Sequence, residues 1–324
     1  AIRSRGLGDV YKRQQLDKRD EDCPELYYFG PTKPEEYINN SKCMAQNFNC
    51  PPYSHGDAHI KQAEELLRDW FKKVQPIAED RMTLLMFISL ALKAFNYKKM
   101  MVNIGESGDN AKSSTFEYAV WALGTYGTVG DKNLIVKGGK KDHVSQAEFD
   151  CIRFILFEEP DASKSLDTEY LKDLIGGASE GKGRKNYSNK NDILFHCKCA
   201  LNANTMTSVQ LESAIFKRLL WMIWVARFTP NDAEVDEAKH IYKADEKFKT
   251  TKYWSSKYDG LIWLMLNHYR LFELNDNKLV ITERQQQRTR AELMENDLFI
   301  RWWNHNYVHL TDTPSNKQKF VTSE

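Results

Sequence analysis

The segment from residue 105 to residue 116 has the residue types of a phosphate-binding loop. It reads GESGDNAKSSTF, follows a short run at residues 100–104 (MMVNI) that predicts a buried strand, and leads into a stretch of helical character that extends to Leu123. Backbone N–H groups at a helix N-terminus attract an anion, a Lys side chain neutralises its charge, and a Ser or Thr hydroxyl reaches Mg²⁺. Lys112 and Ser113 stand in the order that these roles require. The candidate loop residues are Gly105, Glu106, Ser107, Gly108, Asp109, Asn110, Ala111, Lys112, Ser113 and Ser114.

The loop departs from the strict pattern G-x-x-x-x-G-K-[ST], because Glu106 and Ala111 occupy its two glycine positions. Taken alone, the segment is equally consistent with a Gly-containing turn that carries an exposed Lys. A methyl group at Ala111 would crowd a phosphate or disfavour the backbone conformation that Gly adopts. The residues therefore leave open a nucleotide-binding protein with impaired catalysis.

Two acidic residues follow a second apolar segment. Residues 151–157 read CIRFILF, which predicts a buried strand, and Glu158 and Glu159 come directly after it, with Pro160 closing the segment. A nucleotide hydrolase needs one carboxylate to hold the water shell of the metal and another to orient or deprotonate the attacking water. Glu158 and Glu159 fit these roles in that order. An isolated Glu-Glu pair is more often a solvated turn, so the assignment depends on its neighbours.

Further polar residues flank two later strands, which we predict at residues 193–201 and 219–225. Asn202 and Asn204 follow the first of these strands, and an Asn side chain can hydrogen-bond both a water molecule and a γ-phosphate. Arg218 precedes the second strand and carries the planar guanidinium suited to phosphate charge. Any one of these residues is more often a surface residue. Their order along successive strands favours a nucleotide-hydrolysing site.

Alternating strands and helices must position these residues. Apolar residues recur at helical spacing along residues 63–74, and the stripe consists of Ala63, Leu66, Leu67, Trp70, Phe71 and Val74. Residues 81–95 are apolar nearly all round and predict a buried helix, and a short helix ends at Gly176-Gly177. The chain turns helical after Phe228, with long helices at residues 254–272 and 283–308. The pattern predicts an α/β core with a helical C-terminal subdomain.

The overall composition excludes several classes of protein. The 324 residues include 46 Lys and Arg against 45 Asp and Glu, and the resulting net charge of +1 excludes a generally basic, histone-like binder. With 41% hydrophobic and 12% aromatic residues, the chain is not intrinsically disordered as a whole. The longest apolar run, residues 82–95, is shorter than the roughly 18 residues of a membrane span and contains Lys93. We therefore expect no membrane partner.

The cysteines do not favour a disulfide framework. Six are spread unevenly with no secretory signal before them, which indicates a reducing, intracellular compartment. The sequence His196-Cys197-Lys198-Cys199 has no second Cys or His pair at zinc-site spacing, so we interpret Cys197 and Cys199 as a buried pair on one strand face. A metal site built from Cys23, Cys43 and Cys50 with His55 or His59 is the less favoured alternative, because its spacing matches no familiar site.

Five short motifs occur in a characteristic order. They are NIG at residues 103–105 with Gly108, Asn110, Lys112 and Ser113; RFILFEE at 153–159; LKDLIGG at 171–177 with Lys182 and Arg184 downstream; NANT at 202–205; and KRL at 217–219. With these motifs the segment from about Ala63 to Phe228 resembles the helicase domain of superfamily III, within the AAA+ ATPases. It is most similar to the primase–helicases of poxviruses and other large DNA viruses, and to the helicase half of phage and plasmid primases.

The resemblance implies a fold and a set of roles. The fold would be an AAA+ P-loop NTPase core of three α/β/α layers, with an N-terminal helical subdomain and a C-terminal helical, winged-helix-like extension. The protein would form a homohexameric ring with ATP and Mg²⁺ between neighbours and single-stranded DNA in the pore. Lys112 would contact the β- and γ-phosphates, Ser113 and Glu158 would hold the Mg²⁺, and Glu159 would contact the attacking water. Asn204, which we prefer over Asn202, would contact the γ-phosphate, and Arg218 would reach the ATP of the adjacent subunit. Lys182, Arg184 and Lys185 would contact the DNA phosphates.

We expect four regions along the chain. Residues 1–57 are an irregular lead-in whose first 14 residues resemble translated sequencing-adapter read-through, and residues 58–98 form a collar-like helical subdomain. Residues 99–232 are the helicase core, and residues 233–324 the C-terminal region, so the chain is expected to be a fragment truncated at both ends. The predicted protein is an ATP-dependent DNA helicase of a viral or mobile-element replication system, acting on single-stranded or forked DNA in the host cytoplasm or nucleus, with a primase domain as a possible upstream neighbour. The alternatives are an impaired nucleotide-binding scaffold and an AAA+ motor that acts on protein or packages DNA.

Overall fold

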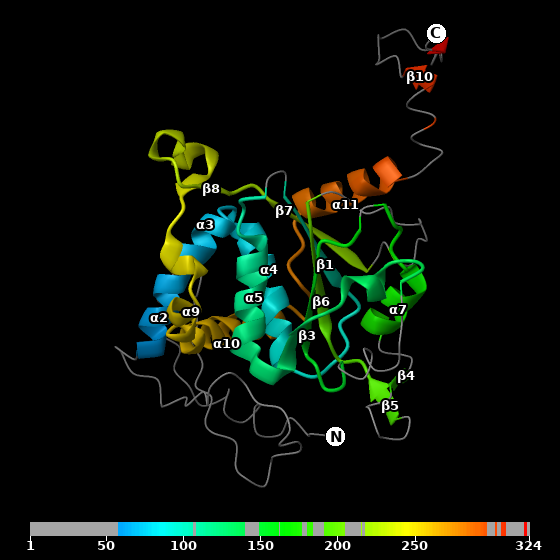
Figure 1. The fold of residues 1–324 in the computed structure, drawn as a ribbon, viewed down its shortest axis with the longest axis horizontal. Coiled ribbons are helices and arrows are strands. Elements are labelled where there is room, and N and C mark those ends of the chain that lie inside the picture. The colour runs from blue at the N-terminus through cyan, green and yellow to red at the C-terminus, as the bar shows by residue number, and fades with distance from the viewer. Residues whose placement is uncertain are drawn as a thin grey trace.

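A parallel sheet forms the centre of the protein (Figure 1). The computed structural model describes residues 58–105, 108–139, 149–161, 163–176, 180–183, 191–204, 215, 218–296, 302, 306–308 and 321–322. Its five-stranded sheet has the order β2-β3-β6-β1-β7, and every neighbouring pair is parallel. The strands are β1 (Met100–Gly105), β2 (Gly127–Val129), β3 (Phe154–Glu158), β6 (Lys198–Ala203) and β7 (Leu219–Trp224). The predicted α/β class is confirmed.

Alternate residues of the strands enter two separate cores, because successive side chains of a strand point to opposite faces. On β1, Met101 packs on one face and Met100 and Val102 on the other. The first face is covered by α5 (Lys112–Leu123), and the second by α7 (Thr168–Gly176) and the turn η5 (Lys132–Ile135). Burial on both faces explains why β3 and β7 consist almost entirely of apolar residues.

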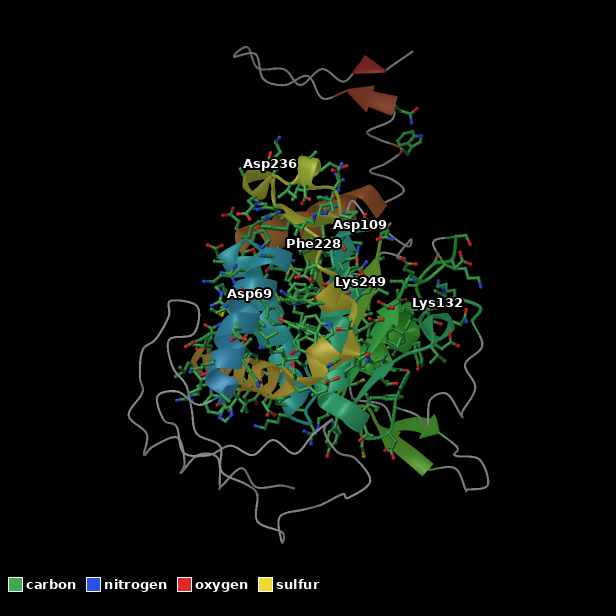
Figure 2. All side chains as sticks on the ribbon, turned by 60° about the vertical axis from the view of Figure 1, so that its left-hand side comes forward. Asp69, Asp109, Lys132, Phe228, Asp236 and Lys249 are labelled. Carbon is green, nitrogen blue, oxygen red and sulfur yellow. The ribbon has the colours of Figure 1, made fainter. Side chains whose placement is uncertain are left out.

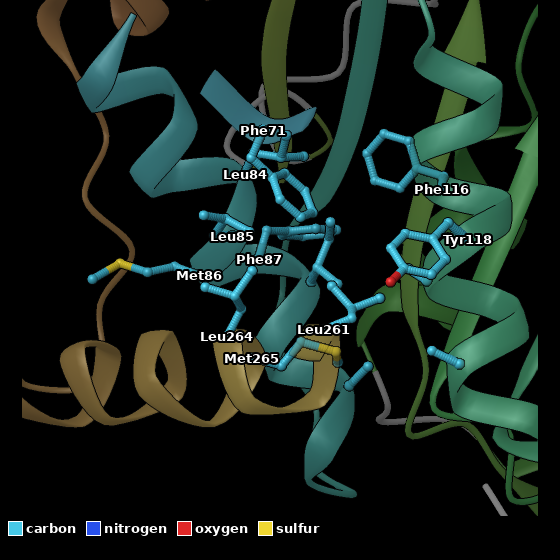
Figure 3. Packing of buried hydrophobic residues seen from close by; sticks show 14 of the residues in the cluster. Phe71, Leu84, Leu85, Met86, Phe87, Phe116, Tyr118, Leu261, Leu264 and Met265 are labelled. Carbon is cyan, nitrogen blue, oxygen red and sulfur yellow. The ribbon is translucent and has the colours of Figure 1, made fainter. Parts of the chain in front are cut away.

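A helical layer lies outside α5. It begins with α2 (Ala58–Leu66), a π-helical turn η2 (Leu67–Phe71) and α3 (Lys72–Val74), and continues with α4 (Ala78–Ser89) and η3 (Leu90–Leu92). All six residues of the apolar stripe predicted along residues 63–74 are buried. Figure 3 shows Phe87 of α4 packed between Phe71 and residues Leu261 and Met265 of α10 (Tyr258–Leu274). Helices from both ends of the described chain therefore share one core with α5.

The segment between β7 and α10 contradicts the expected helical tail. Residues 227–249 form a short parallel pair, β8 (Arg227–Thr229) with β9 (Ile241–Lys243), and three single turns. These turns are η6 (Asp232–Glu234), η7 (Glu237–Lys239) and η8 (Glu246–Lys249), and two of them begin with an Asn or Asp side chain that accepts a backbone N–H. Such local caps compete with helix formation. The helix predicted at residues 254–272 is divided into α9 (Thr251–Ser255) and α10.

Two other sequence predictions are corrected at their boundaries. The strand predicted at residues 193–201 is two strands, because β5 (Asn191–Leu194) pairs with β4 (Glu180–Gly183) in an antiparallel hairpin before β6 joins the sheet. The helix predicted at residues 283–308 is α11 (Glu283–Asn296), and β10 (Tyr307–Val308) pairs with β11 (Val321–Thr322). A reciprocal capping box of Thr282 and Gln285 fixes the start of α11. The remaining turn is η4 (Gly124–Tyr126).

Among the described helices, none has the length and apolarity needed to cross a bilayer.

Lys198 at the start of β6 is a fully buried cation. Its Nζ donates to the carbonyl oxygens of Lys93 and Phe95, both at 2.7 Å, and of His196 at 3.2 Å, and lies 4.1 Å from the centre of the Phe95 ring. These bonds tie the amino end of the sheet to the segment that follows η3. Burial lowers the pKa of Lys198 from 10.5 to about 7.

The folding stability should therefore depend on pH through Lys198. Between pH 7 and about 10 the unfolded chain keeps this proton while the folded chain loses it, so the free energy of unfolding rises with pH. Relative to Lys198→Met, the wild-type protein is expected to gain a few kcal/mol of stability over this range, as measured by urea denaturation of both proteins. If the free energies of unfolding of the two proteins changed equally with pH, the three carbonyl groups would be keeping Lys198 charged, contrary to this expectation.

Candidate functional site

The turn into α5 has the geometry of an anion-binding loop. Ala111 adopts the left-handed conformation, with φ of 61°, and Lys112 is the first residue of the helix. The backbone N–H and the hydroxyl of Thr115 both donate to the Ala111 carbonyl oxygen, at 3.1 and 2.8 Å. The first N–H groups of α5 point out of the helix and carry its positive dipole end. A left-handed Ala costs about 1 kcal/mol relative to Gly, so the sequence departure at Ala111 has a conformational cost.

Gly105 is the glycine whose lack of a side chain matters most to the loop. Asn110, which is buried, lies over the Gly105 backbone, and a Cβ added at Gly105 would clash with Asn110 Nδ2 and stand 2.9 Å from Lys112 Nζ. Asn110 Oδ1 accepts the Lys112 backbone N–H at 3.4 Å. A Cβ added at Gly108 would meet no atom of the described residues within 4 Å.

We therefore expect substitution by alanine to destabilise the fold at Gly105 and to have little effect at Gly108. Gly105→Ala should lower the free energy of unfolding by about 2 kcal/mol, because Asn110 and Lys112 must move. Gly108→Ala is the matched control and should change it by less than about 0.5 kcal/mol. Urea denaturation measures both. Equal effects would show that Asn110 does not need the space above Gly105.

Three predicted site residues form a hydrogen-bonded chain at the carboxyl edge of the sheet. Lys112 Nζ donates to Asn204 Oδ1 at 2.9 Å, and Asn204 Nδ2 donates to Glu159 Oε1 at 3.0 Å. Burial lowers the pKa of Lys112, and the Glu159 carboxylate opposes this shift. Glu159 is a second non-Gly residue in the left-handed region, with φ of 45°, and its N–H donates to the Asn202 carbonyl oxygen at 2.9 Å. Such conformations cluster at functional sites.

A second hydrogen-bonded chain lies beside the first and ends at the other acid. Trp224 Nε1 donates to Asn103 Oδ1 at 3.0 Å, Asn103 Nδ2 to Asn202 Oδ1 at 3.0 Å, and Asn202 Nδ2 to Glu158 Oε1 at 3.3 Å. The half-buried Glu117 of α5 faces the same carboxylate. Burial raises the pKa of Glu117, and the negative charge of Glu158 raises it further.

Lys112, Asn204, Glu159 and Asn202 border a cavity of about 590 Å³ with a polar and an aromatic end. The polar end is lined by residues 108–114, Glu159 and residues 202–204, and the aromatic end by Trp70, Phe228, Pro230, Phe248, residues 244–246 and Lys249. Trp70 Nε1 donates to Thr115 Oγ1 at 3.2 Å, which joins the π-helical turn to α5. Figure 2 shows Asp109 beside Phe228, whose N–H donates to the Asp109 carbonyl oxygen at 2.7 Å, with Lys249 nearby.

Sequence reasoning did not find the aromatic end. In the sequence, Trp70 indicates only part of an apolar helix stripe, and Phe228 only the end of the segment that carries the motifs. The one sequence signal is that Trp70 and Phe248 are large aromatic residues in segments that flank the predicted core on either side. Trp70 and Phe248 pack with ring centres 4.8 Å apart, so the two flanking segments meet over the loop.

The other predicted site residues lie at the opposite edge of the sheet from the cavity or outside the described residues. Arg218 precedes β7 at the amino edge of the sheet, opposite the cavity, and its Nη1 donates to the Lys172 carbonyl oxygen in α7 at 3.1 Å. Lys182 belongs to the β4–β5 hairpin, which projects from the molecule at the same edge (Figure 1). Glu106, Ser107, Arg184 and Lys185 lie outside the described residues.

The residues at the polar end suit a magnesium ion bound to phosphate. Mg²⁺ prefers oxygen ligands, is held by one or two carboxylates together with phosphate oxygens, and keeps several waters. Ser113 offers an exposed hydroxyl on the cavity wall, and Glu158 is half-buried with one carboxylate oxygen held by Asn202. No cluster of three or more His, Cys, Asp or Glu residues that could hold a metal occurs in the described part of the chain. Cys197 and Cys199 are buried as expected, with sulfur atoms 3.8 Å apart.

Comparison with known proteins finds likeness at the level of structure. No protein-family model and no curated protein matches the sequence. The A form apo structure of the NrS-1 C-terminal region is similar over 90% of this chain and 64% of that one, with 12% identity and a TM-score of 0.50. A second apo structure of that region covers 83% of this chain and 61% of that one, with 10% identity and a TM-score of 0.47. The chain thus spans less than two thirds of the region that it matches, and what it shares with the NrS-1 C-terminal region is the fold.

Proposed function

We propose that the protein binds and hydrolyses a nucleoside triphosphate, with ATP as the expected substrate. The observation that carries this proposal is the chain Lys112–Asn204–Glu159 at the N-terminus of α5, inside a cavity of about 590 Å³. A cation and a carboxylate are thereby joined through one amide, at a place where helix N–H groups favour an anion. This volume lies in the range of 300–1,000 Å³ typical of ligand pockets.

The two ends of the cavity match the two ends of a nucleotide. The loop and Lys112 suit the triphosphate, whereas Trp70, Phe228 and Phe248 suit a planar base. Lys112 would stabilise charge on the transferred phosphoryl group, and Glu159 would orient the attacking water and accept its proton. Asn204 would hold both in register. Mg²⁺, held through Ser113 and Glu158, would supply charge neutralisation on the phosphate oxygens.

We further propose that hydrolysis drives movement on single-stranded or forked DNA within a hexameric ring of a replication protein. The motifs that resemble superfamily III helicases support this proposal, as does the fold shared with the NrS-1 C-terminal region. The hairpin that carries Lys182 lies at the sheet edge opposite the cavity, so polymer and nucleotide would bind separate surfaces. Arg218 lies at that edge too and would reach only the nucleotide of another subunit. A primase domain upstream, and a host cytoplasmic or nuclear location, stay expectations from the resemblance.

The proposal is tested by steady-state phosphate release from ATP with the purified protein, with and without single-stranded DNA. We expect turnover that single-stranded DNA stimulates, together with strand separation of a forked duplex. ATP hydrolysis that DNA leaves unchanged would favour a motor acting on protein. Absence of both nucleotide binding and hydrolysis would contradict the proposed function.

Ala111→Gly separates an active enzyme from an impaired scaffold. Glycine adopts the left-handed conformation at Ala111 without the cost of about 1 kcal/mol, so the loop should be more stable and bind nucleotide up to about fivefold more tightly. If the wild-type protein is an impaired scaffold, turnover should rise tenfold or more as well. A change in turnover below twofold would show that the wild-type loop is competent. Isothermal titration and phosphate release measure the two effects.

A further inference from the structure

A row of polar side chains crosses the sheet and meets the cavity at Asn202. In the register of the sheet, Glu158 of β3 pairs with Asn202 of β6, and Asn202 pairs with Asn103 of β1. All three lie on the α5 face, because Leu156, Ala200 and Met101, two residues earlier on each strand, pack in the core on that face. Trp224 of β7, on the same face, completes the row.

The row can be hydrogen-bonded in only one direction. The indole N–H of Trp224 is a donor only, so the oxygen of Asn103 must face it and the amide nitrogen of Asn103 must face Asn202. The same reasoning turns the amide nitrogen of Asn202 towards Glu158. An ionised carboxylate is an acceptor only, so the chain runs from a fixed donor to a fixed acceptor.

The row is also shielded from water. Asn103, Asn202 and Trp224 are exposed by 0%, 1% and 2% of their surface. A buried amide that loses a partner is left unsatisfied at a cost of about 1–3 kcal/mol, so each side chain holds the next in its orientation. Glu158 is the one member that reaches partial exposure.

We propose that Trp224, Asn103 and Asn202 are positioning residues that fix the orientation of the Glu158 carboxylate for divalent-metal binding. One oxygen of Glu158 is engaged by Asn202, which leaves the other to face the metal. Partners behind a metal ligand set its orientation, and their loss typically lowers metal affinity about 10- to 100-fold. The inference rests on the proposed function, since the metal arrives with the nucleotide phosphates.

The sequence provides a matched control for this proposal. Trp221 lies three residues before Trp224 on the same strand, is 1% exposed, and packs in the core on the opposite face. Its Nε1 has no hydrogen-bond partner in the part of the chain that the structure describes. Tryptophan to phenylalanine therefore removes a similar volume from each core but breaks the polar row only at Trp224.

The experiment measures the affinity for Mn²⁺, by electron paramagnetic resonance, in the presence of a non-hydrolysable ATP analogue. We expect Asn202→Ala to weaken Mn²⁺ binding about 10-fold and Trp224→Phe about 3-fold, with Trp221→Phe unchanged. Affinity for the analogue without metal should stay within twofold in Trp224→Phe and Trp221→Phe. Equal Mn²⁺ affinity in Trp224→Phe and Trp221→Phe would overturn the proposal.

A second measurement is independent of nucleotide and metal. The side-chain amide protons of Asn202 should exchange with solvent at least about 10-fold faster in Trp224→Phe than in Trp221→Phe, as measured by NMR. Faster exchange supports the row even if the wild-type protein hydrolyses no nucleotide, which would sink the proposed function alone. Unchanged exchange in Trp224→Phe would show that Trp224 does not hold the row.

Discussion

Lys112→Met is expected to reduce ATP turnover by at least about 100-fold and to weaken ATP binding by a similar factor. Lys112 is the cation at the N-terminus of α5, and removing a preorganised group that faces developing phosphate charge typically costs two to three orders of magnitude. Methionine keeps most of the side-chain volume, and Lys112 is only 5% exposed, so the loop should remain packed. Phosphate release and isothermal titration with ATP measure the effects.

Lys249→Met is the control for the loss of one positive charge at the same cavity. Lys249 lines the aromatic end and forms an exposed ion pair with Glu246. Exposed pairs contribute little, so turnover should change by less than about threefold. A loss of turnover as large as that in Lys112→Met would show that general charge, and not contact with phosphate, explains the first result.

Glu159→Gln is expected to lower turnover by about 100-fold or more while leaving ATP binding within about threefold. Glutamine keeps an oxygen that can accept the Asn204 amide hydrogen bond, so the site geometry should be retained. It cannot accept a proton from the attacking water, which removes the general-base contribution of about 10²–10⁴. The result should be a protein that binds ATP without hydrolysing it.

The comparison with Glu158→Gln separates the two neighbouring acids. In the proposed function Glu158 holds Mg²⁺ and not the attacking water, so Glu158→Gln should raise the Mg²⁺ concentration needed for half-maximal turnover. Glu159→Gln should leave that concentration unchanged. If Glu159→Gln shifts the Mg²⁺ requirement and Glu158→Gln does not, the two roles are exchanged. Full activity in Glu159→Gln would contradict the site assignment.

The sheet could be predicted from sequence because burial on both faces leaves a local signature. Residues 219–225 are an uninterrupted apolar run, residues 100–104 are apolar except for Asn103, and both segments became strands within one residue of the expected limits. The short strand β2 and the β8–β9 pair were missed, since three-residue strands with half-exposed side chains carry little periodicity. The strand predicted at residues 193–201 hid a break, because its two halves pair with different partners.

The sequence by itself determined the residue types at the strand ends: a cation at Lys112, two acids at Glu158 and Glu159, and two amides at Asn202 and Asn204. Only the tertiary structure decided which amide faces which acid, because the parallel register pairs Asn202 with Glu158 and leaves Asn204 to bridge Lys112 and Glu159. It also decided that Trp70 and Phe248 close the cavity. These contacts join residues far apart in the chain, and close packing, which no local pattern encodes, selects them.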